Sequence, residues 1–312
     1  MHRIDGPGAT VDNKFTEGDP VSGVAATTVT DDWLNAVQEE IMAVLAAVGI
    51  APVKASNNQL LAAIRSLSSG PIVSASNARM TLTAASSTTT FTADEVIVGT
   101  ALGGQSYRLS NFNKTVNLAT TGAGGMDTGT APVNGWVALY AIYNPTSGAS
   151  SILAVNSPNA VMPAVYGGAN MPAGYTASAL LTVVPTNASG QFKVVCVRGR
   201  DVHIQLTTAY SGNASVVGNP ISIAGIIPAN AVAILNGELS LQNTSQSAMS
   251  LTITPDASAL GQQNLTSLVS GSGAITANYA MLPVTVDQTM MFTSSSSAGT
   301  PTYSIYVGGY RL

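Results

Sequence analysis

Carboxylates are the first side chains of this sequence that could do chemistry, because paired Asp or Glu residues cleave glycosidic bonds. The candidates, most of them beside expected turns, are Asp94, Glu95, Asp127, Asp201, Glu238, Asp256 and Asp287. Apart from the adjacent Asp94 and Glu95, they are isolated along the chain. The sequence therefore indicates no clustered acid pair, and we predict no catalytic residues.

Histidine, cysteine and glycine offer little more. His2 lies near the N-terminus and His203 alternates within an expected strand, so both are interpreted as structural or surface residues. Cys196, the single cysteine, lies in the apolar run 192–197, which predicts a buried, inert thiol. The Gly-rich segment 122–129 lacks the Lys-Ser/Thr of a phosphate loop. With no metal-ligand spacing, we expect neither a metal nor a cofactor.

Sugar recognition is the chemistry that the polar stretches of the C-terminal third could support. Sugars present hydroxyls and apolar ring faces, which amide and aromatic side chains can contact. Three expected loops carry such side chains, and the candidate contact residues are Tyr210, Asn213, Gln242, Asn243, Gln246, Gln262, Gln263 and Asn264. Loops rich in Ser and Asn are also ordinary solvated surface, so both interpretations stay open.

The composition narrows the partners. Apolar residues make up 46% of the 312 residues and charged residues only 8%, against about a quarter in ordinary soluble domains. The net charge is −4 and no basic stripe exists, so nucleic acid is not an expected partner. No window approaches 18 consecutive apolar residues, so we expect no membrane insertion. The N-terminus lacks the apolar segment of a signal peptide, which predicts a protein that stays in the cytoplasm that made it or leaves by lysis.

The N-terminal part contains the clearest local signals. Residues 1–29 predict an extended arm that is ordered only against another surface. Residues 30–70 predict a helical attachment segment, with Thr30 as N-cap and Gly49 at the end of its first helix. Apolar residues at spacings of three and four, with the flanking tryptophan, give a candidate interface of Trp33, Leu34, Val37, Ile41, Val44 and Val48.

A second short helix is expected to start at residue 57 or 58, with Leu60, Leu61, Ile64 and Leu67 on one side. Two arrangements of this segment stay open. Either the two helices form a hairpin that buries both apolar faces internally, or the first helix packs around a threefold axis.

From residue 79 the pattern changes to short alternating strands separated by turns. We expect a linker over 71–78, a first β-sandwich over 79–199 and a C-terminal β-sandwich over 200–312, both jelly-roll-like. Residues 198–201 are the expected hinge between the two sandwiches. The last strand should lie inside its sheet.

Residues 30–41, TDDWLNAVQEEI, resemble the T-x-x-W-L-N-x-x-Q-E-E-hydrophobic helix near the N-terminus of many phage and prophage tail-fibre proteins. Residues 15–20 and 58–64 match the same pattern, and parts of 127–145 and 171–180 are similar to a β domain of those fibres. The resemblance implies a homotrimer that attaches to tail or baseplate proteins through residues 1–70. It also implies contact with a host-surface glycan or protein through distal loops.

The leading hypothesis is therefore a mainly β, homotrimeric virion protein with a small N-terminal helical segment, a short tail fibre or spike. Nothing between the helices and the sandwiches could serve as a long shaft, so an adaptor or collar-type fibre without receptor binding stays open. A carbohydrate-active enzyme or lectin is the alternative from a different class.

Overall fold

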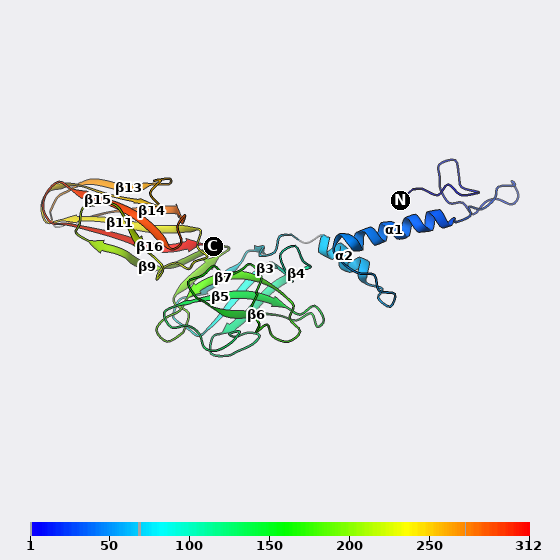
Figure 1. The fold of residues 1–312 in the computed structure, drawn as a ribbon, viewed down its shortest axis with the longest axis horizontal. Helices are drawn as coiled ribbons and strands as arrows, with labels where there is room; N and C mark the ends of the chain where they lie inside the picture. Colours follow the sequence, from blue (N-terminus) through cyan, green and yellow to red (C-terminus); the bar gives the residue numbers. More distant parts are fainter. Residues whose placement is uncertain (1, 68–69, 272) are drawn as a thin grey trace. The chain divides into compact units, whose positions relative to one another are not determined.

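The protein is mainly β, with two helices near the N-terminus (Figure 1). The computed structural model describes residues 2–67, 70–271 and 273–312. The helices are α1 (Asp31–Ala47) and α2 (Gln59–Leu67). The strands are β1 (Ala75–Ser76), β2 (Arg79–Leu82), β3 (Thr88–Gly99), β4 (Ser106–Asn117), β5 (Trp136–Tyr143), β6 (Ser150–Ser157), β7 (Ala177–Pro185), β8 (Val195–Arg198), β9 (Asp201–Gly212), β10 (Val216–Ser222), β11 (Ala233–Asn243), β12 (Ser247–Thr254), β13 (Gln263–Val269), β14 (Ala274–Pro283), β15 (Thr289–Ser296) and β16 (Pro301–Arg311).

The chain divides into two compact units. The first, called the helical unit below, comprises residues 1–69 and 104–107, and the second, the β unit, comprises 70–103 and 108–312. The range expected to be a linker, 71–78, contains the short strand β1, which pairs with β3. These residues therefore belong to the sheet of the β unit.

Helix α1 begins and ends where the local chemistry requires. The Trp33 backbone N–H donates to the Thr30 hydroxyl at 3.4 Å, and Asp31 and Asp32 place negative charge in the first turn, where the helix dipole favours it. At the other end Gly49 adopts a φ of +69°, a left-handed conformation that glycine reaches without a Cβ clash. Neither helix of the described chain is long and apolar enough to cross a membrane.

The N-terminal arm is irregular but not extended. Within residues 2–29 the regular pairing consists of one isolated bridge between Asp19 and Val24. The arm folds back on itself, because the Thr28 N–H donates to the Pro7 carbonyl at 2.9 Å and the Thr27 N–H to the Thr16 carbonyl at 3.0 Å. These hydrogen bonds make the arm irregular instead of extended. Its ordering against another surface stays a prediction.

One large sheet runs through most of the β unit in the order β14-β11-β16-β9-β8-β2-β3-β7-β5-β6, with β1 and β4 also paired to β3. Strand β5 lies between β6 and β7 and is buried along almost its whole length, as is β7. This is why the run 136–143 is apolar at nearly every position instead of alternating.

The C-terminal part of the β unit is a sandwich of two four-stranded layers. One layer is the β14-β11-β16-β9 end of the large sheet, and the other is a separate sheet in the order β10-β15-β12-β13. Its interior contains Leu251, Phe292, Tyr303 and Ile305, all buried. The last strand, β16, lies inside its sheet between β11 and β9, as predicted.

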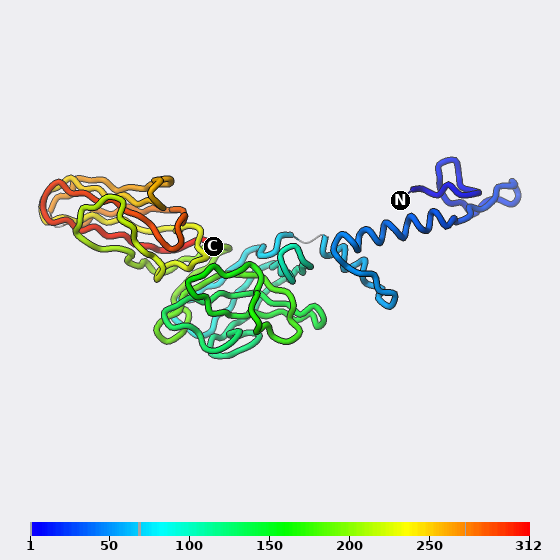
Figure 2. The backbone as a smooth tube through the Cα atoms, in the orientation of Figure 1, coloured from blue at the N-terminus to red at the C-terminus, as the bar shows by residue number. Residues whose placement is uncertain are grey.

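The expected hinge at residues 198–201 is instead a tight hairpin between β8 and β9, so the large sheet continues from one β region into the other. Figure 2 traces the backbone of the β unit from residue 70 (cyan) to its C-terminus (red). The end of β16 fixes this junction. The Tyr310 hydroxyl donates to the Val183 carbonyl of β7 at 2.6 Å, and its ring meets the Trp136 ring edge to face at 5.8 Å. A hinge is excluded here because buried side chains and paired strands cross the boundary.

Candidate docking and contact surfaces

The candidate interface on α1 is partly exposed to solvent. Leu34 and Ile41 are 54% and 41% exposed, while Val37, Val44 and Val48 are half-buried. Because Leu34 and Ile41 are seven residues apart, they lie on the same side of the helix. The candidate interface is therefore present as an apolar stripe on the surface of a single chain.

Helix α2 adds to this uncovered surface. Its larger apolar side chains, Leu60, Leu61, Ile64 and Leu67, are between 38% and 57% exposed. The two helices pack on one another, yet among their described residues only Leu45 and Ala63 are buried. The expectation of a helical hairpin that buries both faces internally is wrong, because large apolar side chains of both helices remain exposed.

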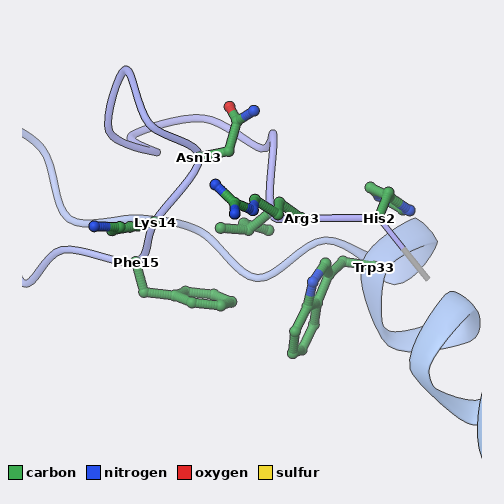
Figure 3. Close-up of a pocket in the computed structure, with 7 residues that line it drawn as sticks. His2, Arg3, Asn13, Lys14, Phe15 and Trp33 are labelled. Atoms are coloured by element: carbon green, nitrogen blue, oxygen red, sulfur yellow. The ribbon is translucent and has the colours of Figure 1, made fainter.

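A hollow of about 500 Å³ opens between the folded arm and the start of α1 (Figure 3). Ile4, which is buried, lies in its wall, and the Phe15 and Trp33 rings meet edge to face at 5.1 Å. The polar lining comes from His2, Arg3, Asn13 and Lys14. Of the predicted interface residues, Trp33 alone lines this hollow, and it does so from the first turn of α1.

Sequence reasoning missed this hollow because its residues are scattered over an arm without periodicity. Phe15 stands in the segment that resembles tail-fibre proteins, and this was the available signal. The contact between Phe15 and Trp33 depends on the way the arm folds back, which no spacing in the sequence reveals.

The predicted contact residues of the C-terminal sandwich fall into two groups at opposite ends. The register of the strands brings the β9–β10, β11–β12, β13–β14 and β15–β16 connections to one end, called the distal end below. Asn213, Gln242 and Gln246 are exposed at this end. The β10–β11, β12–β13 and β14–β15 connections lie at the other end, with exposed Gln262 and Asn264.

Several of these residues lie in strands and have structural roles instead of forming loops. Tyr210 belongs to β9, is half-buried, and its ring lies 4.3 Å from that of Phe292. Asn243, at the end of β11, is only 2% exposed, and its amide donates to the Ser296 hydroxyl at 3.0 Å and to the Ala298 carbonyl at 2.9 Å. Gln242 and Asn264 also lie in strands, with their side chains exposed.

Gln263, at the start of β13, is occupied by β14. Its side-chain amide donates to the Ala280 carbonyl at 2.6 Å, and its carbonyl oxygen accepts from the Ala280 N–H at 3.2 Å. These two hydrogen bonds hold the side chain against β14 and leave it one N–H and one oxygen lone pair for a ligand. Among the predicted contact residues, Asn213, Gln242 and Gln246 therefore form the group best placed for an external partner.

The distal end carries no charged residue in its connections, which consist of 213–215, 244–246, 297–300 and the β13–β14 connection. Its surface is made of hydroxyl, amide and glycine groups. Such a surface can exchange hydrogen bonds with a neutral polar partner such as sugar hydroxyls, without strong long-range charge effects.

Several of the candidate carboxylates have a polar partner of their own. Asp127 accepts a hydrogen bond from Tyr166 at 2.9 Å. Burial is the main cause that raises the pKa of Tyr166 to about 12, and this hydrogen bond is the second. Asp256 accepts hydrogen bonds from Ser258 and Thr285, which lower the pKa of its carboxyl. A lowered pKa is the opposite of what a general acid requires.

Three further candidates also have partners. Asp94 accepts a hydrogen bond from Asn77, Glu95 lies 3.4 Å from the Arg108 guanidinium, and Asp201 pairs with Arg311. Cys196 is only partly buried, with the Thr81 hydroxyl 3.8 Å from its sulfur, so the expectation of a buried thiol is corrected. Within the described residues, no group of three or more His, Cys, Asp or Glu side chains could hold a metal ion.

Comparison with known proteins gives partial likenesses. No family model matches the chain. The chain is 41% identical over 73 residues to "Uncharacterized protein StfP" of Escherichia coli (strain K12), which is 22% of this chain and 35% of that protein. The chain thus spans about a third of the length of this curated relative.

Among solved structures, one described as "Structural basis for the promiscuous specificity of the carbohydrate-binding modules from the beta-sandwich super family" covers 77% of this chain and 99% of its own. The TM-score is 0.16 and the identity 12%, so this likeness carries no argument about ligand or fold.

Proposed function

We propose that this protein is a structural protein of a phage virion, a short trimeric tail fibre or spike. Its residues 1–70 attach it to tail or baseplate proteins, and the distal end of its C-terminal sandwich contacts the host surface. The proposal rests on the resemblance of residues 30–41 to tail-fibre proteins, together with the geometry of the helical unit and of the distal end.

The observation that carries the proposal is the uncovered apolar face of α1 and α2. Six large apolar side chains remain at least 38% exposed on these two helices, namely Leu34, Ile41, Leu60, Leu61, Ile64 and Leu67. Exposed apolar surface is unfavourable in water by about 25 cal/mol per Å². If three copies pack with their α1 helices around a common axis, the apolar stripe of α1 becomes buried, as in a short helical bundle built on heptads.

The test is the mass of the particle in solution. By size-exclusion chromatography with light scattering, we expect the mass of three 31.5 kDa chains. Ile41→Asp should yield single chains, because three carboxylates would be buried against one another at the axis.

Ala43→Asp is the matched control for this experiment. Ala43 is exposed and lies two residues from Ile41, about 200° around the helix. The control adds the same charge to the opposite face of α1 and should stay trimeric. A monomeric wild-type chain, or equal masses for the two variants, would refute the proposal.

A further inference from the structure

The hollow between the arm and α1 has walls and a rim of different chemistry. Phe15, Trp33 and Ile4 give it an apolar interior. Arg3 and Lys14 contribute two permanent positive charges to the lining, which also contains His2, and among the described residues no carboxylate lines the hollow. Figure 3 shows the Phe15 and Trp33 side chains extending to the same side of the backbone. An apolar cavity with a cationic rim favours a ligand that is apolar at its centre and negatively charged at its edges.

In the described part of the helical unit, no ion pair neutralises the positive charges of the rim. Within the described residues, neither Arg3 nor Lys14 forms an ion pair with a carboxylate, and the Arg3 guanidinium instead reaches the Asp12 carbonyl at 3.5 Å. His2 does have an acidic neighbour, since its Nε2 lies 3.6 Å from Asp5. Arg3 and Lys14 are therefore the groups that can attract a negatively charged ligand.

We infer that this hollow binds a peptide segment of a partner protein in which a large apolar side chain is flanked by carboxylates. The inference rests on the proposed attachment through residues 1–70 and adds the site and the chemistry of the partner. The apolar side chain enters beside Phe15 and Trp33, and the carboxylates pair with Arg3 and Lys14.

A protein segment fits these observations better than an anionic membrane. Membrane surfaces are recognised by clusters of about four to eight basic residues, whereas the rim offers two permanent cations. A hollow of about 500 Å³ is also large enough for one aromatic side chain with its neighbouring backbone.

The test uses the full chain labelled with 5-fluorotryptophan and the peptide acetyl-Glu-Phe-Glu-amide as probe. The chain has two tryptophans, so its fluorine spectrum reports Trp33 and Trp136 separately, and Trp33→Phe assigns the signals. We expect the peptide to shift the Trp33 signal in a saturable way and to leave the signal of the buried Trp136 unchanged.

Two control peptides separate the contributions of charge and apolar contact. Acetyl-Gln-Phe-Gln-amide removes the carboxylates and acetyl-Glu-Ala-Glu-amide removes the ring, and both should bind more weakly. Equal binding of the Gln peptide would overturn the charge assignment. No shift of Trp33 at millimolar probe, or a shift with phosphatidylglycerol vesicles in place of the peptide, would overturn the inference.

Variants of the rim complete the design. Each exposed ion pair contributes about two- to fivefold in affinity, so Arg3→Gln combined with Lys14→Gln should weaken the probe about tenfold and abolish its salt dependence. The matched control is Lys54→Gln, an exposed lysine of the helical unit away from the hollow, which should bind like the wild type. Unchanged binding in the rim variant would refute the inference.

The mass of the same samples distinguishes the two proposals. If the chain is trimeric and the peptide does not shift the Trp33 signal, the inference is overturned and the proposed function stays in place. A monomeric chain that binds the probe with the expected preference overturns the trimeric fibre and leaves the peptide site in place.

Discussion

Two neighbouring residues at the end of β16 show how single side chains hold the β unit together. Arg311 donates to both carboxylate oxygens of Asp201, from Nε at 2.6 Å and from an Nη at 2.8 Å. Beside it, the buried Tyr310 donates its hydroxyl to β7. Arg311 thus ties β16 to the beginning of β9, while Tyr310 ties it to the neighbouring β region.

We predict that Asp201→Asn removes an acid-sensitive part of the stability. The hydrogen bonds and charge of Arg311 hold the pKa of Asp201 below its ordinary value, against the opposing effect of burial. A carboxyl with a lowered folded-state pKa stabilises the fold above its unfolded-state pKa, and this contribution is lost as the pH falls through the folded-state value. Urea unfolding of the wild type and the variant should therefore differ at pH 7 and converge in acid.

Asp287→Asn is the control for this experiment, because Asp287 is an exposed carboxylate without an ion pair in the described part of the chain. It should leave the unfolding midpoint at pH 7 close to that of the wild type. If both variants lose the same stability at pH 7, the pairing of Asp201 with Arg311 is not the cause.

At the residue scale the sequence predicted capping well and contacts poorly. Thr30 could be recognised because an N-cap depends on the next three residues. Asn243 and Gln263 were expected on the surface because amides usually are. Instead, the Asn243 amide donates to Ser296 and Ala298, and the Gln263 amide donates to Ala280 of β14. Such partners are brought close only by the register of the sheets.

At the scale of elements, the strand pattern reveals what local signals can and cannot predict. Strand β11 continues through Asn236 and Gly237, although this pair is typical of turns. A Cβ at Gly237 would collide with the Tyr279 ring, so this glycine serves close packing instead of a turn. Gln263 and Asn264 were expected in a loop because they are polar, but they begin strand β13.

We predict that Thr30→Val frays the start of α1. Valine keeps the branched shape but loses the oxygen that accepts from the Trp33 N–H, and loss of an N-cap costs about 1 kcal/mol. Hydrogen exchange at the amides of residues 31–35 should become faster by up to about tenfold. Thr28→Val, at an exposed position before the helix, should leave these amides unchanged, and equal acceleration in both variants would contradict the capping role.

At the scale of the whole molecule, the two units differ in how much they bury. The buried apolar residues of the helical unit are Ile4, Leu45 and Ala63 within the described chain, whereas the β unit contains several tens of them. The β unit has a core of its own. Helices as short as α1 and α2 are marginal by themselves, so we expect their stability to depend on what covers their apolar side chains.

We predict that the stability of the helices depends on protein concentration and that of the sandwiches does not. Association stabilises whatever it covers by mass action. Hydrogen exchange in α1 should slow as the chain concentration rises, while exchange in β5 stays constant. In the Ile41→Asp variant the concentration dependence should disappear, and concentration-independent exchange of α1 in the wild type would argue against assembly through the helices.

The amide of Gln263 has a consequence for how copies can lie next to each other. By donating to and accepting from Ala280, it reproduces both hydrogen bonds of a backbone pair and bridges the border strands β13 and β14 of the two layers. Open border strands invite foreign strands and lead to fibrils or swapped oligomers. Because Gln263 occupies the N–H and C=O of Ala280, a neighbouring chain cannot pair its backbone with β14 at this position. Chains that lie side by side here can make side-chain contacts without forming a continuous intermolecular sheet.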